Sequence, residues 1–260
     1  MNRIDELREK LQGPRRHADT LYGRLVMRRL SIYVTAFLSL FPISPFWVNL
    51  ASILCGVAGA WMLSRGQWIA GVLLVNGWYL LDHVDGELAR YRRVFYATGL
   101  FFDSMANTIV VPAAFVGIGS GLAVTGSGRA LLLTGFAAAY GSMMLFAVPY
   151  CESAVILQRV RQGRIRLETT PGAVIKMPER GSFYRNAFSF LHGLATFPVF
   201  LPIFTALIFG SSLVSPPFLD RAVRSILLLY AFLTNSVWMA VMGHAVISLK
   251  IDKRYPPVSS

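Results

Sequence analysis

Long apolar segments alternate with short polar ones along most of the 260-residue chain. A helix needs about 20 residues to cross the hydrocarbon core of a bilayer, and six segments are apolar over roughly that length. They run Phe46–Ser64, Gln67–Tyr91, Ala97–Val124, Ala130–Leu157, Ala187–Gly210 and Ala222–Leu249. The pattern predicts an all-α integral membrane protein with six transmembrane helices.

A shorter apolar segment, Met27–Phe41, precedes these six. Arg24, Arg28 and Arg29 lie near its start, and Pro42 follows it. Its length of about 15 residues is short for a span and typical of an amphipathic helix that lies at the membrane interface. A short seventh span is the alternative.

The composition also indicates a membrane protein, because charged residues make up only 15% of the chain, against roughly 25% in soluble domains. The formal net charge is +12. Its basic residues gather beside the apolar segments, which indicates contacts with anionic lipid and not a nucleic-acid groove. With six spans, all but four of the 25 lysines and arginines fall on one side, so both termini are expected in the cytoplasm. The four exceptions are Arg65, Arg129, Arg221 and Arg224.

Acidic residues inside the predicted spans concentrate in one helical hairpin, and at such depths they indicate a function by default. The five are Asp82, Asp85, Glu87, Asp103 and Glu152. Asp82 and Asp85 are three residues apart and share a helix face. Asp103 and Asn107 are four apart and share another. Glu87 is expected to point roughly 160° away from Asp85, toward solvent, lipid head groups or a neighbouring helix.

The two acidic faces are expected to meet, because a short turn makes their helices antiparallel neighbours. Asp82 and Asp103 each lie roughly 10–12 Å from the cytoplasmic end of their helix. Three carboxylates cannot all stay ionised at one low-dielectric site without cations. One interpretation is a divalent ion, with Mg²⁺, Mn²⁺ or Ca²⁺ favoured over zinc by the oxygen ligands. The others are a hydrogen-bonded carboxylate set and a proton relay.

The residues of this hairpin follow a known motif. They read D-x2-D-G-x2-A-R-x8-G-x3-D-x3-N from Asp82 to Asn107. The pattern resembles the signature of the CDP-alcohol phosphotransferase family, D-x2-D-G-x2-A-R-x8-G-x3-D-x3-D, and departs from it at the last position. The matching residues are Asp82, Asp85, Gly86, Ala89, Arg90, Gly99 and Asp103. More loosely, the segment from Pro42 to Asn49 is similar to the "TPN-x-x-T" start of the family's first span.

The resemblance implies a phospholipid-synthesising transferase whose active site faces the cytoplasm. Such an enzyme moves a phosphatidyl or related phospho-group from a CDP-linked lipid to a small alcohol and releases CMP. The runner-up is transfer of a phospho-head group from a soluble CDP-alcohol to a diradylglycerol. The expected partners are the CDP-linked donor, the alcohol and membrane lipids. Nucleic acid is not expected, and the chain is either a monomer or a homodimer. Residues 1–45 would form a cytoplasmic part with the interfacial helix, 46–250 a six-helix catalytic domain and 251–260 a cytoplasmic tail.

The resemblance also implies roles for individual residues. Two Mg²⁺ or Mn²⁺ ions would bind the donor pyrophosphate, and their ligands would be Asp82, Asp85, Asp103 and Asn107. The donor-binding residues would be Asp85, Gly86, Ala89, Arg90 and Gly99. Gly86 would admit the nucleotide, Arg90 would offer a charge-assisted fork, and Gly99 would allow tight packing of its helix. Asp103 and Asn107 stand at the catalytic positions.

Asn107 matters most among these, because the family's last Asp is implied to be both a metal ligand and the base that takes the alcohol proton. An amide offers a carbonyl oxygen but accepts no proton at neutral pH. The chain is then a substituted form of an active enzyme, a natural member with another base, or a member that has lost catalysis. Glu152 and His83 are the candidates for another base. Outside the enzyme class, the rivals are a non-enzymatic binder of CDP-lipid and a cation-coupled transporter.

Overall fold

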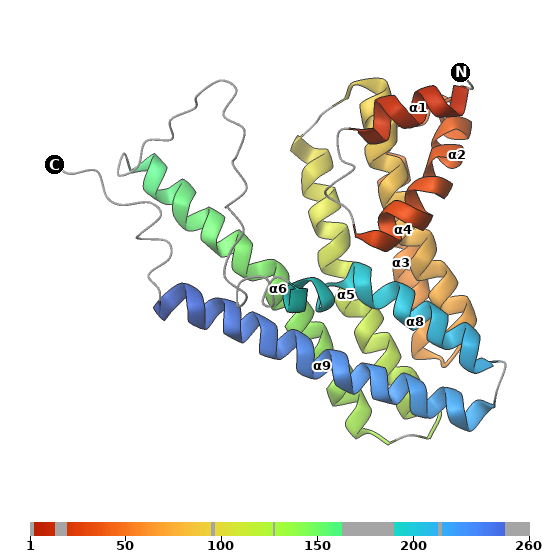
Figure 1. The fold of residues 1–260 in the computed structure, drawn as a ribbon, viewed down its shortest axis with the longest axis vertical. Helices are drawn as coiled ribbons and strands as arrows, with labels where there is room; N and C mark the ends of the chain where they lie inside the picture. Colours follow the sequence, from red (N-terminus) through yellow and green to blue (C-terminus); the bar gives the residue numbers. More distant parts are fainter. Residues whose placement is uncertain are drawn as a thin grey trace.

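The computed structural model of the chain describes residues 3–13, 20–94, 97–126, 128–162, 190–212 and 215–247. These residues fold into helices, and none of them forms a β-strand. Figure 1 shows α1 and α2 beside one end of α4, and α9 running along α6 and α8. The predicted tail at 251–260 and most of the loop before the fifth predicted span lie outside the described residues.

The helices largely match the predicted segments. In chain order they are α1 (Arg3–Gln12), the π-helical turn η2 (Gly23–Met27), α2 (Arg28–Leu38), α3 (Pro45–Ser64), α4 (Trp68–Arg92), α5 (Ala97–Val124), α6 (Ala130–Arg161), α8 (Phe197–Ser212) and α9 (Pro216–Ile247). Four of those in the described part, α3, α5, α6 and α9, are long and apolar enough to cross a membrane. Helix α4 carries three carboxylates and α8 has only 16 residues. The count of six spans and the side of the termini therefore stay predictions.

Helix α3 lies between α4 and α5 and packs against both. Gly117 of α5 lies against the Ala60 carbonyl of α3, where a β-carbon would have no room. In a membrane such close approaches stabilise a bundle through van der Waals contact, because lipid tails are as apolar as the side chains they replace. Aromatic rings join α5, α8 and α9. The ring centre of Phe200 lies 4.8 Å from that of Phe115 and 4.5 Å from that of Tyr230.

Two short helices, α1 and α2, form an amino-terminal helix pair that packs on α4. The segment predicted to form an interfacial helix, Met27–Phe41, contains α2, which confirms that it is helical. The sequence pattern does not predict α1, whose Leu7 and Leu11 are buried against Ile32 of α2. Tyr33 and Phe37 of α2 are exposed, as expected of an interfacial helix that presents apolar side chains to lipid.

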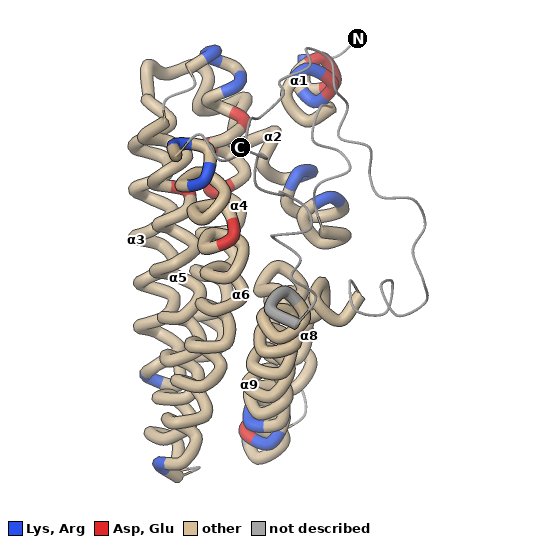
Figure 2. The backbone as a smooth tube through the Cα atoms, turned by 90° about the vertical axis from the view of Figure 1, so that its left-hand side faces the viewer, with Lys and Arg blue, Asp and Glu red and all other residues tan. Residues whose placement is uncertain are grey.

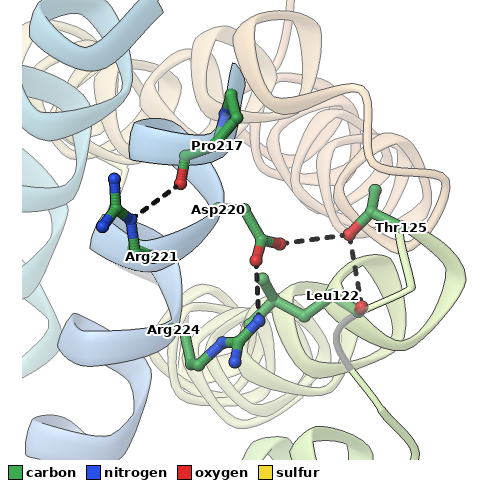
Figure 3. A network of polar contacts seen from close by, with 6 residues as sticks. All are labelled: Leu122, Thr125, Pro217, Asp220, Arg221 and Arg224. Carbon is green, nitrogen blue, oxygen red and sulfur yellow. Dashed lines mark hydrogen bonds and ion pairs between the residues drawn. The ribbon is translucent and has the colours of Figure 1, made fainter. Parts of the chain in front are cut away.

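A polar cluster lies at the opposite end of the bundle, where α5 ends and α9 begins (Figure 3). Asp220 accepts hydrogen bonds from Arg224 Nη2 at 2.8 Å and from the Thr125 hydroxyl at 3.4 Å. Both charged side chains are partly exposed, so the pair contributes about 1 kcal/mol or less. A cavity of about 510 Å³ adjoins Trp68 in the same region. Figure 2 shows most charged positions toward the ends of the helices, with long uncharged stretches between them.

Candidate active site

The acidic residues of α4 and α5 meet in the structure. Asp82 and Asp85 lie one turn apart on α4, and Asp103 lies on α5. The Asp82 carboxyl group lies close enough to Asp85 and Asp103 for their negative charges to repel it. The structure therefore brings the two predicted acidic faces together, and their depth in a membrane stays a prediction.

This meeting does not depend on direct packing of α4 on α5. The two helices run antiparallel, as expected (Figure 1), but few of their backbone positions approach closely, because α3 packs against both. Gly56 of α3 lets Trp78 of α4 and Val110 of α5 come within van der Waals contact of its backbone. The predicted antiparallel direction is confirmed, and α3 mediates most of the packing between the two helices. The carboxyl side chains of α4 and α5 approach one another where the backbones do not.

Helix α3 also holds Asp85 in place. Asn49 Nδ2 donates a hydrogen bond to Asp85 Oδ2 at 2.6 Å, and Asn49 is only 4% exposed. Its Oδ1 is buried and lacks a hydrogen-bond partner within the described residues. The sequence prediction did not place Asn49 in the site. The sequence did offer a signal, because Asn49 places a polar amide about one turn inside an apolar span, where polar side chains are costly and therefore indicate a function.

The donor atoms of this cluster suit a divalent ion. Asp82 Oδ1 is buried and has no hydrogen-bond partner in the described part of the chain, which is costly unless a cation or proton satisfies it. Carboxylate and amide oxygens are the ligands that Mg²⁺ and Mn²⁺ prefer. Among residues that the structure describes, no three His, Cys, Asp or Glu side chains already converge as a metal site. An ion bound at this cluster would require these side chains to turn toward it.

Asn107 lies on α5, one turn after Asp103, and is half-buried. Its Nδ2 donates to the backbone carbonyl of Asp103 at 3.0 Å. The side-chain carbonyl oxygen is then the group that can act as a ligand. The position suits a metal ligand, but the amide has no site that accepts a proton at neutral pH.

The last turn of α4 carries Ala89 and Arg90. The Ala89 carbonyl accepts a hydrogen bond from the Val94 N–H at 3.0 Å, which ends the helix. Arg90 Nε donates to the carbonyl of Leu11 in α1 at 2.8 Å. The Arg90 charge also attracts Asp85. Arg90 thus lies between the amino-terminal helix pair and the acidic cluster.

The two motif glycines are not needed for packing. A β-carbon on Gly86 would lie 3.5 Å from Arg90 Nη1, an ordinary van der Waals contact. A β-carbon on Gly99 would meet no described atom within 4 Å. The expectation that Gly99 allows tight helix packing is therefore wrong, because α5 approaches its neighbours closely further along, at residues such as Gly117.

Comparison with known proteins decides the family. The model of the CDP-alcohol phosphatidyltransferase family matches residues 43–177, just over half of the chain. The chain belongs to this family. The matched region includes α3, α4, α5 and α6, and so every residue of the acidic cluster. The family consists of membrane-bound transferases of phospholipid synthesis.

The fold of this family member resembles that of Mycobacterium tuberculosis phosphatidylinositol phosphate synthase. Each comparison gives 19% sequence identity. For the synthase in apo form the TM-score is 0.53, with 86% of this chain and 96% of that chain covered. For the synthase with CDP-DAG bound the TM-score is 0.54, with 88% of this chain and 96% of that chain covered. For the synthase in complex with manganese and citrate the TM-score is 0.56, with 87% of this chain and 90% of that chain covered. No curated protein matches the chain by sequence.

The remaining acidic and basic candidates lie elsewhere in this family member. Glu87 points away from the cluster, as predicted, and is buried against α1 and α2. His83 Nδ1 lies 2.8 Å from the Tyr79 carbonyl. Since a carbonyl only accepts, Nδ1 is the donor, and in the neutral ring Nε2 is the basic atom. Glu152 is half-buried near the C-terminal end of α6.

Proposed function

We propose that this chain transfers a phosphatidyl or related phospho-group from a CDP-linked lipid to a small alcohol and releases CMP. The observation that carries the proposal is the meeting of Asp82, Asp85 and Asp103 within the family motif. The related synthase with CDP-DAG bound supports a CDP-linked lipid as the donor. The charge asymmetry of the sequence supports a site that faces the cytoplasm, with both termini on that side.

The site is proposed to work with two Mg²⁺ or Mn²⁺ ions. Their ligands would be the three carboxylates and the side-chain carbonyl oxygen of Asn107. When bound, the ions neutralise charge on the donor pyrophosphate and on the departing CMP. The manganese complex of the related synthase supports divalent metal use, and the unpartnered Asp82 oxygen supports it in this chain.

The protein side chains then bind and orient the donor. Asn49 fixes one oxygen of Asp85, so that carboxylate keeps its orientation before substrate arrives. Arg90 lies beside Gly86 and Asp85, and its terminal nitrogens are proposed to pair with donor phosphate oxygens. Gly86 leaves room for the nucleotide there.

The acceptor alcohol attacks the phosphorus, and the bond from phosphorus to the CMP oxygen breaks. The alcohol proton has to go to a base or to water. Asn107 cannot take it, so the candidates are Asp103, one turn earlier on α5, and His83 and Glu152. The amide also supports a second candidate function. A chain without its base can still bind CDP-lipid and act as a binder with little turnover.

A transfer assay tests the proposal. The chain, reconstituted in lipid nanodiscs with Mn²⁺ or Mg²⁺, is given CDP-diacylglycerol and a panel of small alcohols, and mass spectrometry measures CMP and the lipid product. We expect CMP and product to appear together with one alcohol, and neither to appear with Asp85→Asn. Specific CDP-diacylglycerol binding by this chain without product would favour the binder. Absence of binding as well would contradict both functions.

Gly86→Ala should weaken donor binding without loss of stability. The added methyl group has room in the free protein, so a loss of affinity of about tenfold would reflect space needed by the nucleotide. Gly117→Ala is the matched control, because its methyl group meets the Ala60 carbonyl and should cost about 1–3 kcal/mol in stability. Tm and the Kd for CDP-diacylglycerol are measured for both variants. Unchanged affinity in Gly86→Ala would show that residue 86 does not face the donor.

A further inference from the structure

Glu87 is a buried carboxylate that the proposed chemistry does not use. It is 1% exposed and lies among residues from α1 and α2. Its Oε1 accepts hydrogen bonds from Gln12 Nε2 at 2.7 Å and from Ser31 Oγ at 2.6 Å, and its Oε2 accepts one from Thr35 Oγ1 at 2.7 Å. Burying a carboxylate is costly unless it is well hydrogen-bonded. Glu87 therefore specifies how the amino-terminal helix pair sits on α4.

The same contacts fix the end of α1. Gln12 Nε2 also donates to the Arg28 carbonyl at 2.7 Å, and Arg28 Nη1 donates back to the Gln12 carbonyl at 2.7 Å. An isolated helix as short as α1, with 10 residues, is marginal in water. Its position is therefore set by these polar contacts and by Leu7 and Leu11 against Ile32.

Arg90 contacts the neighbouring residue in the same turn of α1. Its Nε donates to the Leu11 carbonyl at 2.8 Å, one residue before Gln12. Glu87 and Arg90 are three residues apart on α4, so they share a face and reach adjacent residues of α1. Figure 1 shows α1 lying beside the C-terminal end of α4, where both residues are found.

We infer that Glu87 is a positioning residue for donor binding, which acts by holding α1 so that the Leu11 carbonyl orients the Arg90 guanidinium beside Asp85. The inference rests on the proposed function in one respect, namely that Arg90 binds the CDP-linked donor. Without the Glu87 contacts, the Leu11 carbonyl loses its fixed position. Arg90 Nε then loses its anchor, and the terminal nitrogens lose their orientation. Pre-ordered charged groups bind phosphate more tightly than groups that must be ordered on binding.

A double-mutant cycle tests the inference. The Kd for CDP-diacylglycerol is measured in nanodiscs with Mn²⁺ for wild type, Glu87→Ala, Arg90→Ala and the double variant. Each single substitution should weaken binding by about tenfold or more. The double variant should bind about as weakly as Arg90→Ala, because Glu87 acts through Arg90. Phe204→Ala, in the core remote from the site, is the stability control and should lower Tm while leaving the Kd unchanged.

Conservative variants separate positioning from folding. Glu87→Gln keeps the shape and can still accept from Gln12 and donate to Thr35, so it should regain most of the affinity. Thr35→Val removes one hydrogen bond at nearly constant volume, and it replaces Glu87→Ala in the cycle if the latter does not fold. A small, measurable loss of affinity that disappears in the Arg90→Ala background would support the inference.

Other results would overturn it. One is a lower Tm with unchanged Kd in Glu87→Ala and Thr35→Val, which would make the contacts purely structural. A second is a loss of affinity in the double variant that equals the product of the two single losses, which would show that Glu87 and Arg90 act independently. Wild-type affinity in Arg90→Ala would also overturn it, because Arg90 would then not bind the donor. The double-mutant cycle measures only donor binding. Absence of product in the transfer assay would therefore count against the proposed function but not against this inference.

Discussion

Removal of divalent ions should abolish binding of CDP-diacylglycerol, and Mn²⁺ or Mg²⁺ should restore it. Asp82, Asp85 and Asp103 meet at one place in α4 and α5, and an oxygen of Asp82 is buried without a hydrogen-bond partner in the described part of the chain. A pyrophosphate brought to three carboxylates is repelled unless cations lie between them. Donor binding is measured in excess chelator and after titration with Mn²⁺. Direct Mn²⁺ binding is followed by electron paramagnetic resonance.

The control uses Asp220, a carboxylate near the start of α9. Asp220→Asn changes a residue at the opposite end of the bundle that is already paired with Arg224, so it should leave Mn²⁺ binding unchanged. Asp85→Asn should lower Mn²⁺ affinity and turnover by about 10²-fold or more, because it removes a ligand charge. Full donor binding in excess chelator would refute the metal assignment. Equal effects of Asp85→Asn and Asp220→Asn on Mn²⁺ would refute the choice of ligands.

The helices of the bundle could be predicted from the sequence because lipid imposes one simple pattern. Long apolar runs have to be helical in a bilayer, and α5 has the bounds that the apolar run predicted. The same reasoning missed α1, which is short and charged. Its stability comes from residues far away in the sequence, such as Ile32 and Glu87. Hydropathy along the chain carries no information about those contacts.

The site was predictable to the extent that helix periodicity determines it. Spacing along α4 and α5 placed Asp82 and Asp103 on faces that meet, and it placed Glu87 on another face. It could not show that α3 packs against both helices, because that depends on side-chain volumes at positions such as Gly56. The contact from Asn49 to Asp85 was missed for the same reason.

Asn107→Asp should raise turnover while changing donor affinity much less. General-base assistance typically contributes about 10²–10⁴-fold to rate, and a carboxylate at this position would also strengthen a metal site. Asn107 lies one turn after Asp103 on α5, with its amide nitrogen on the Asp103 carbonyl, so the side chain of an aspartate fits the same place. Donor binding should depend mainly on Asp82, Asp85 and Arg90, which the substitution leaves unchanged.

Product formation by the present chain and by Asn107→Asp, at saturating metal and donor and across the alcohol panel, makes the decisive comparison. Asn107→Leu, of similar size but without an oxygen ligand, is the matched control and should be less active than either. A large gain in Asn107→Asp alone would identify the present chain as an impaired form of an ordinary family enzyme. Robust activity in the present chain with no gain would refute that account, because another group would then take the alcohol proton. His83→Gln and Glu152→Gln would follow, and the variant that loses rate while keeping its Kd for CDP-diacylglycerol would identify the base.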